Sequence, residues 1–554
     1  MTRRRVLAGF FAFILLPLAG LAAPRSRLQE IEVLKLQYLS AKNPDQRKGA
    51  VGRLKALAKR SPAEDAVAVN AAVSAMLPGA DSIAEAETLL EIGAAHPAIN
   101  ARKREQGKSE DTEFLVDAQR AAQASTRPAG DIEKLADIRI DHLHKDSLGR
   151  DGLTTAHVQQ VWRINTLQGA KSFSPRPVTY AAMGEALCIV RARVLKGDGR
   201  EVEATVSADQ PVVEKGSAMY FDSRTRDLRF SQLEPGDVVE AEYYLLPAAE
   251  VNPCGGYYAR LDLFRDYLPT QLWRRVVIAP NMMKLYAVEH EMRPAVLRQD
   301  GEKTTRIWEM RNIGARAFEA LSPGASESGP YLHISTIGTM EEFGRWYNEL
   351  LEPALKLDEN LRAEAERIRQ HNLSTQGKVQ AVYESVQRNT KYVAFEFGVH
   401  SYQPYTVSTV GRRGFGDCKD KAAMIVALLR AMGVPAEFAM VRTRTAGAMA
   451  EQAYSAQLFD HAVAYVPELD LYLDGTVQSA VLGVLPPNVQ GAMAVTVDAE
   501  GRATRRTMPS SSLDANQVAR RLPAQVGRNS KVELVSQSLG TSLRLKKTEP
   551  HGGD

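Results

Sequence analysis

Apolar residues recur at helical spacing through the first quarter of the chain. Runs such as RLQEIEVLKLQYL and SIAEAETLLEIGAA place apolar side chains three and four residues apart, which is the spacing of one helix face. Ala, Leu, Glu, Lys and Arg dominate around these runs, and all of them favour helices. We therefore predict a helical region over 24–148, and the pattern leaves open whether it is a scaffold or a docking arm.

The pattern changes to short alternating runs between 149 and 336. Segments such as CIVRARVLKGDGREVEATV and DLRFSQLEPGDVVEAEYYL alternate apolar and polar residues and are broken by turn signals. The Asp-Gly pairs at 198–199 and 300–301 indicate hairpin turns, because glycine accepts positive φ there. Several strands at this spacing predict an antiparallel β-sandwich-like domain over 149–336.

Helical spacing returns in a third region, which we place at 337–500. In the run STQGKVQAVYESVQRNT, Ser374 or Thr375 can cap a helix with one apolar face. The later run KAAMIVALLRAM is apolar on nearly every side and is followed by Gly433 and Pro435, which stop a helix. This second run predicts a buried helix.

A strand-like run opens at His461 in the segment LFDHAVAYVPELDLYLDGT. Residues 467–470 read as a turn, and LYLDGT reads as a return strand. A hairpin about that turn brings Asp474 close to facing His461. The helices and strands together predict an α+β fold, with a short β or irregular segment over 501–554.

Composition limits the classes of protein that fit these elements. The chain has 554 residues, 25% charged and 44% hydrophobic, which suits two to four globular domains. Its 70 basic and 66 acidic residues leave a formal net charge of +4, so charge gives no reason to expect a nucleic-acid partner.

The first residues change the picture by predicting export. Three arginines precede an apolar run of about 17 residues that ends in small residues, a pattern typical of a secretory signal peptide. An uncleaved anchor usually needs about 20 apolar residues. We expect cleavage after 1–23, a periplasmic or secreted location, and a mature chain that is not an integral membrane protein.

Cysteine usage singles out one thiol. The chain has three cysteines, and an odd number in an exported protein leaves at least one outside an intramolecular disulfide. Cys188 and Cys254 lie in one predicted domain, so a disulfide between them and two separate thiols both remain open. Cys418 stands apart, just before the buried helix.

The surroundings of Cys418 suit a reactive sulfur. The segment GFGDCKDKAAM places Cys418 in or beside the first helical turn, where free backbone N–H groups and the helix dipole stabilise a thiolate. Lys419 and Lys421 add positive charge, while Asp417 and Asp420 oppose it. We expect these two aspartates to cap and brace the turn rather than react.

Downstream residues complete a catalytic trio. Cys418, His461 and Asp474 fit a nucleophile, a general base and an acid that orients the imidazole. Asp460 is a worse orienter because adjacent strand residues point to opposite faces, and Asp470 lies at the turn. Chance alone would place these residue types in any long chain, so the interpretation depends on the helix and hairpin around them.

The motifs GDCKDKAAMIVALLRAMGVPAEFAMVRTR, FDHAVAYV and LYLDGT resemble the three core motifs of the transglutaminase-like superfamily in its bacterial form. The resemblance implies a papain-like α+β core, with Cys418 as nucleophile, His461 as base and Asp474 as orienter. It covers roughly 150–500, because the β-rich region resembles the domain of unknown function that often precedes this core in exported bacterial proteins.

An oxyanion donor carries over less directly. The position needs a backbone N–H, which we assign to Cys418, and an upstream side chain. Gln403 is the candidate by analogy with papain-like enzymes, although a glutamine beside Pro404 is equally well a loop residue. Relatives also continue into a longer β-rich C-terminal region than this chain has.

The predicted activity is acyl transfer or amide hydrolysis through a thioacyl intermediate. The expected partners are a protein or peptide with an amide acyl group and components of the cell envelope, with no metal and no cofactor. The alternative is a non-catalytic envelope-binding or scaffold module with an inactive cysteine site. Whether water or an amine resolves the intermediate depends on a cleft that the sequence does not show.

Overall fold

The computed structural model divides into two compact units, 1–111 and 112–554. It describes most of 137–511 and shorter parts before and after it. The described residues are 27–58, 69, 72–73, 76, 113–124, 137–182, 184–213, 218–247, 252, 254–264, 269–315, 322–324, 326–371, 374–449, 453–477, 482–511, 520–521 and 535–536. The predicted signal peptide lies outside these residues.

The first unit contains two described helices, α1 (Arg27–Leu39) and α2 (Pro44–Ala58). Their inward side chains, among them Leu34 and Leu54, form a small apolar core together with four buried residues between 69 and 76. This part confirms helical structure within the region predicted to be helical.

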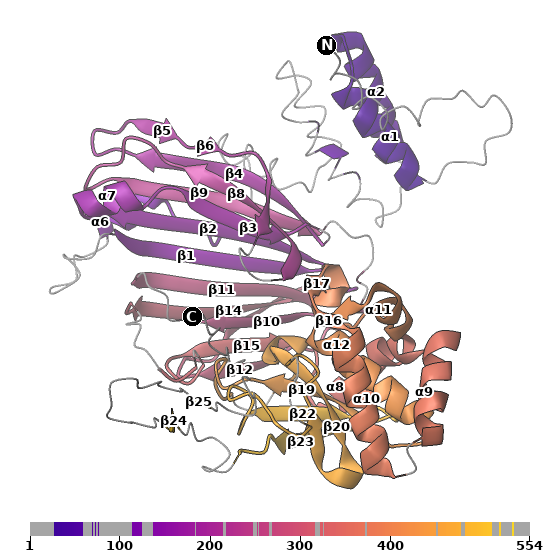
Figure 1. Cartoon of the computed structure of the whole chain (residues 1–554). Coiled ribbons are helices and arrows are strands. Elements are labelled where there is room, and N and C mark those ends of the chain that lie inside the picture. The colour runs from indigo at the N-terminus through magenta and orange to yellow at the C-terminus, as the bar shows by residue number, and fades with distance from the viewer. Residues whose placement is uncertain are drawn as a thin grey trace, which may run out of the picture. The chain divides into compact units, whose positions relative to one another are not determined.

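The second unit begins with a large β structure (Figure 1). Its main sheet has eight strands in the order β13-β14-β11-β1-β2-β9-β4-β5. These strands are β1 (Asp137–Leu148), β2 (Thr154–Ile164), β4 (Glu185–Leu195), β5 (Glu201–Glu203), β9 (Val238–Pro247), β11 (Thr270–Pro280), β13 (Val296–Asp300) and β14 (Lys303–Ile313).

Two smaller sheets pack on the main sheet through shared apolar cores. Trp273 of the main sheet packs with Leu332, and Trp162 packs with Leu228. The first small sheet is β10 (Ala259–Leu263), β15 (Tyr331–Ser335) and β12 (Tyr286–His290), and the second is β17 (Ala394–Glu396), β8 (Met219–Arg229) and β3 (Arg176–Ala181) with β6 (Thr205–Val206) and β7 (Gln210–Val213). Short helices α6 (Ala118–Ala124) and α7 (Leu167–Ser172) flank these layers.

Both predicted hairpin turns are confirmed. Leu195 pairs with Glu201 across the first turn, and Asp300 pairs with Lys303 across the second. The region predicted to be wholly helical over 24–148 also needs a correction, because β1 lies inside it. Its sequence, DIRIDHLHKDSL, alternates polar and apolar residues over the first five positions, which is a strand signal that the prediction of a helical region overlooked.

The third region is a helical layer on a sheet. Its sheet has the order β21-β20-β19-β22-β23, with β19 (Glu437–Arg442), β20 (His461–Val466), β21 (Leu471–Leu473), β22 (Met493–Val497) and β23 (Ala503–Thr507). The helices are α8 (Met340–Leu351), η4 (Glu352–Leu355), α9 (Glu359–His371), α10 (Thr375–Asn389), η5 (Gly398–Ser401), α11 (Val407–Arg413), α12 (Cys418–Ala431), η6 (Ala456–Leu458) and η7 (Pro467–Leu469). The short strands β16 (Lys391–Tyr392) and β18 (Phe415–Gly416) pair in parallel.

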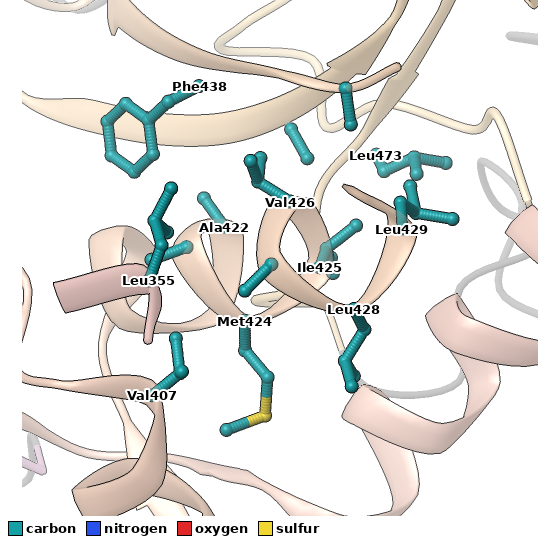
Figure 2. Close-up of a cluster of buried hydrophobic side chains, with 14 of the residues drawn as sticks. Leu355, Val407, Ala422, Met424, Ile425, Val426, Leu428, Leu429, Phe438 and Leu473 are labelled. Carbon is teal, nitrogen blue, oxygen red and sulfur yellow. The ribbon is translucent and has the colours of Figure 1, made fainter. Parts of the chain in front are cut away.

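Helix α12 is the centre of this region. Figure 2 shows Ile425, Val426 and Leu429 pointing into the cluster that includes Phe438 and Leu473 from the sheet. Nearly all of its side chains are buried, as its uniformly apolar sequence predicts. Because the helix is fixed on every side, the position of its first residue is fixed as well.

Strand β17 joins the cysteine-bearing region to the β structure before it. It pairs in parallel with β8, and Figure 1 shows it at the junction of the two regions. A second connection is made by Tyr257, whose ring stacks on Trp346 of α8 at 4.3 Å. Its hydroxyl accepts a hydrogen bond from the Ala456 N–H at 3.0 Å. The two regions therefore share a sheet and an aromatic contact.

The C-terminal segment is described only in part. Strand β23 pairs with β22, and a short pair, β24 (Arg520–Arg521) with β25 (Val535–Ser536), follows it. The remainder of the predicted segment 501–554 lies outside the described residues. Within the described part of the chain, no helix is long and apolar enough to span a bilayer.

Candidate active site

Cys418 is the first residue of α12, as the sequence predicts. Asp417 caps the helix: its side chain accepts from the Asp420 N–H, and the Asp420 side chain accepts in return from the Asp417 N–H. This reciprocal pair is a capping box, which fixes the helix start. The prediction that the two aspartates brace the turn is confirmed.

Charged neighbours hold each aspartate on its other side. Arg413 donates to Asp420 at 2.5 Å, and Lys419 donates to Asp417 at 2.5 Å. Burial, followed by the charge of Asp417, raises the pKa of Asp420 to about 7. Lys419 Nζ also lies 3.5 Å from Glu396 Oε1, and Glu396 is the last residue of β17. The residues on both sides of the sulfur are thus committed to a rigid turn.

His461 and Asp474 come together through the predicted hairpin. His461 is the first residue of β20, η7 makes the turn, and Asp474 directly follows β21. His461 Nε2 lies 2.9 Å from Asp474 Oδ2. This leaves Nδ1 as the ring nitrogen available to the Cys418 thiol.

Asp474 is held from several directions. Its Oδ1 accepts from the Thr476 N–H at 2.9 Å and from the Thr476 hydroxyl at 2.6 Å. Tyr383 donates its hydroxyl to the Asp474 backbone carbonyl at 2.8 Å. With 1% of its surface exposed, the carboxylate has a fixed direction toward His461.

The electrostatics couple the three groups. Burial alone would lower the pKa of His461, but hydrogen bonds and charge interactions with Asp474 and Cys418 outweigh it and raise that pKa well above its usual value. Burial opposes ionisation of Asp474, yet hydrogen bonds from His461 and Thr476 lower its pKa. The site therefore favours a charged imidazolium between a carboxylate and a sulfur.

The two rejected acids have other partners. Asp460 accepts from the Thr443 N–H at 2.7 Å and from its hydroxyl at 2.6 Å. Asp470 accepts from the Tyr465 hydroxyl at 2.8 Å. Both contacts brace the ends of β20, so neither acid orients the imidazole.

Gln403 has a different environment from the one its proposed role requires. Its side-chain amide donates to the Leu350 carbonyl at 2.8 Å, at the end of α8. Among the described residues, no hydrogen bond joins it to Cys418, so the oxyanion assignment stays a prediction. The Cys418 N–H has the better position, because the first N–H groups of a helix have no intrahelical acceptor.

Sequence reasoning missed two supporting residues. Thr476 holds the carboxylate of Asp474, and the signal was the Asp-Gly-Thr order, which favours a side-chain-to-backbone turn. Lys421 is fully buried and donates to the Thr390 carbonyl at 2.5 Å. Burial lowers its pKa to about 8, while the charge of Asp474 opposes the shift. In the sequence, Lys421 stands out only as a positive charge near Cys418, and its place directly before an apolar run was the signal that it is buried.

All three cysteines are free, so the disulfide between Cys188 and Cys254 does not form. Cys254 Sγ lies 3.0 Å from the Tyr402 hydroxyl. Burial raises the pKa of Cys188 to about 11 and also raises the pKa of Cys254. Both are poor nucleophiles in these positions.

Two known domain families match the chain. Residues 150–317 match a domain of unknown function, DUF3857, and 362–467 match the transglutaminase-like superfamily. The chain therefore carries a transglutaminase-like domain preceded by a DUF3857 domain, on an α+β fold. This confirms the resemblance inferred from the sequence motifs, and the matched residues include Cys418 and His461 but end before Asp474.

Solved structures agree with this fold. A "putative protease" from Parabacteroides distasonis is 16% identical, covers 68% of this chain and 72% of its own, and has a TM-score of 0.56. A "putative cysteine protease" from Cytophaga hutchinsonii is 12% identical and covers 71% of this chain and 93% of its own, with a TM-score of 0.18, so the agreement in fold is with the first structure. No curated protein matches the chain.

Proposed function

We propose that this protein is a cysteine-dependent acyl transferase or amide and peptide hydrolase. The observation that carries the proposal is the 2.9 Å contact between His461 Nε2 and Asp474 Oδ2, with Cys418 at the buried helix start interacting with the same imidazole. A histidine whose pKa is held above its usual value by a carboxylate can keep a neighbouring sulfur anionic.

The reaction has two stages. In the first, the Cys418 sulfur attacks an amide carbonyl and the S–C bond forms. The C–N bond then breaks as the His461 imidazolium gives its proton to the departing amine, which leaves a thioester. In the second, water or a primary amine attacks the thioester, His461 takes the proton, and the S–C bond breaks.

Asp474 acts through His461 in both stages. It fixes the ring so that Nδ1 faces the sulfur, and its charge stabilises the imidazolium that exists before the leaving group is protonated. The Cys418 N–H is the donor that we assign to the developing oxyanion, where one such donor typically contributes about 10²–10³ in kcat.

Substrate and location are also proposals. We infer a protein or peptide substrate because the proposed chemistry acts on an amide carbonyl, which peptide bonds and glutamine side chains supply. The fold neighbour from Parabacteroides distasonis is described as a "putative protease", which favours water as the acceptor. The arginine-led apolar N-terminus supports export to the periplasm or beyond, where cell-envelope components are available.

The test compares wild type with Cys418→Ala on casein and on glutamine-containing peptide amides, with and without a primary amine. We expect release of amine or new termini by wild type only, with a loss of at least ~10³ in the variant. Incorporation of the added amine would identify an acyl transferase, and its absence a hydrolase.

Iodoacetamide supplies a control that needs no substrate. Cys418 should react faster at pH ~6 than an ordinary free thiol of pKa ~8.5. Equal turnover by the two proteins, together with slow alkylation of Cys418, would remove the enzyme interpretation and leave a binding module.

A further inference from the structure

An aromatic strip lies at the junction of β8, β17 and β18. It consists of Tyr220, Phe395, Phe397 and Phe415. The Phe395 ring is at its centre, with ring centroids 4.9 Å from Tyr220, 5.7 Å from Phe397 and 5.3 Å from Phe415. The strip therefore draws on both the DUF3857 region and the transglutaminase-like region.

The strip is not a buried packing layer. Tyr220 is 51% exposed, and the three phenylalanines are only partly buried. Aromatic rings that serve only to join two domains gain most when they are removed from water, as Trp308 and Phe343 are elsewhere in the described chain. A cluster of partly exposed rings is instead typical of a surface that binds a ligand.

The strip is fixed to the turn that carries Cys418. Phe415 lies three residues before the sulfur, and the Arg413 guanidinium lies 4.7 Å above its ring while it also binds Asp420 of the capping box. On the other side, Glu396 lies between Phe395 and Phe397 in sequence and is 3.5 Å from the Lys419 Nζ. The strip is therefore tied, through Arg413 and Glu396, to the first turn of α12, which begins at Cys418.

The chemistry of the strip favours an uncharged ligand. The nearby charges are already committed to partners, Arg413 to Asp420 and Lys419 to Asp417, so the exposed faces offer carbon surface and ring edges. Large aliphatic or aromatic groups gain from such faces through burial and ring stacking. An acidic group would lose hydration there without gaining a partner, because the faces of aromatic rings carry negative potential.

We propose that the aromatic strip binds a large apolar side chain of the acyl donor, next to the amide that Cys418 attacks. Tyr220 is then a specificity-determining residue supplied by the DUF3857 region. This inference rests on the proposed function for its location at an acyl-donor site, but binding can be measured without turnover.

The experiment uses the full chain with Cys418→Ala, so that peptides bind without reacting. Titration calorimetry compares Ac-Ala-Phe-Gln-Gly-NH₂ with Ac-Ala-Asp-Gln-Gly-NH₂. The phenylalanine peptide should bind at least about 10-fold more tightly, the size of effect that one apolar pocket supplies. Adding Tyr220→Ser should reduce a ~10-fold preference to about 3-fold or less.

Met282→Ser is the matched control, because Met282 is an exposed apolar residue, at 72%, outside the strip. It should leave both affinities unchanged. In the chain that retains Cys418, Tyr220→Ser should leave the thermal midpoint and the iodoacetamide rate of Cys418 as in wild type, which separates lost binding from lost structure.

The outcomes separate the two proposals. Equal affinities, an unchanged preference after Tyr220→Ser, or no binding of either peptide at millimolar concentration would overturn the role of the strip. Turnover of both peptides with equal efficiency would uphold the catalytic proposal and reject this one. A clear preference in binding with no turnover by wild type would uphold the binding role of the strip and reject the catalytic proposal.

Discussion

His461 has a strongly shifted pKa, and this shift links the charge of the site to the stability of the fold. Its pKa is raised well above the usual value because Asp474 and Cys418 outweigh the effect of burial. A group with a raised pKa in the folded state stabilises the fold fully below its unfolded pKa of ~6.5, and that contribution is lost as pH rises through the folded pKa. The histidine therefore links catalysis to stability.

We expect the free energy of unfolding of wild type to fall as pH rises above ~6.5. The His461→Gln variant lacks the titrating group, so its free energy of unfolding should fall less over the same pH range. Urea unfolding of both proteins at closely spaced pH values checks this. Asp420, whose pKa is raised to about 7, titrates in both and cancels in the difference. Parallel curves for the two proteins would contradict the assigned interaction.

At the scale of single residues, the proposed catalytic residues could be predicted from the sequence, whereas the residues that support them could not. The order of Cys418, His461 and Asp474 could be inferred because each lies at a helix start, a strand start or a strand end. Thr476 and Lys421 were missed because their roles depend on which buried atoms face them, and no periodic pattern records that.

The tight packing around the first turn of helix α12 fixes the position of Cys418. Gly416 is pressed against the capping box: an added Cβ would lie 2.6 Å from Asp420 Cβ. Because Asp420 is held by the helix and by Arg413, it has no free direction in which to move.

Gly416→Ala should therefore lower the free energy of unfolding by about 1–3 kcal/mol and slow the reaction of Cys418 with iodoacetamide. Gly411→Ala on neighbouring α11 is the control, because its Cβ would meet Leu361 only at 3.4 Å or more. Equal midpoints in urea for the two variants would show that the turn tolerates the methyl group.

The prediction of helices and strands succeeded for elements with a strong apolar periodicity and failed for very short elements. The buried helix, both hairpins and the hairpin between His461 and Asp474 are confirmed. Strand β17 could not be predicted, because three residues carry no measurable period and their partner β8 lies far away in sequence. Long-range pairing of this kind is decided by tertiary contacts.

On the scale of the whole second unit, the two matched families form one structural body joined by β17 and by Tyr257. Domain boundaries drawn from composition at 336 and 337 therefore separate segments that share a sheet. Composition marks where element types change, and it does not record which region a strand joins.

Tyr257→Ala should cost about 2–4 kcal/mol, because it removes the stacking on Trp346 and the acceptor for the Ala456 N–H. Calorimetry should show a lower and broader transition, or two transitions, where wild type shows one. Tyr257→Phe keeps the ring and should lose only about 1 kcal/mol. If the alanine variant unfolds like the phenylalanine variant, the ring contact does not couple the regions.

The burial of Cys188 and Cys254 has a practical consequence. Both thiols have raised pKa values, whereas Cys418 is the first residue of a helix, where free backbone N–H groups stabilise a thiolate. A chain with three cysteines should therefore accept one equivalent of a thiol-directed label under native conditions, and intact mass would count competent molecules in any preparation. The natural sequence thus provides its own active-site titration, without removal of the other two cysteines.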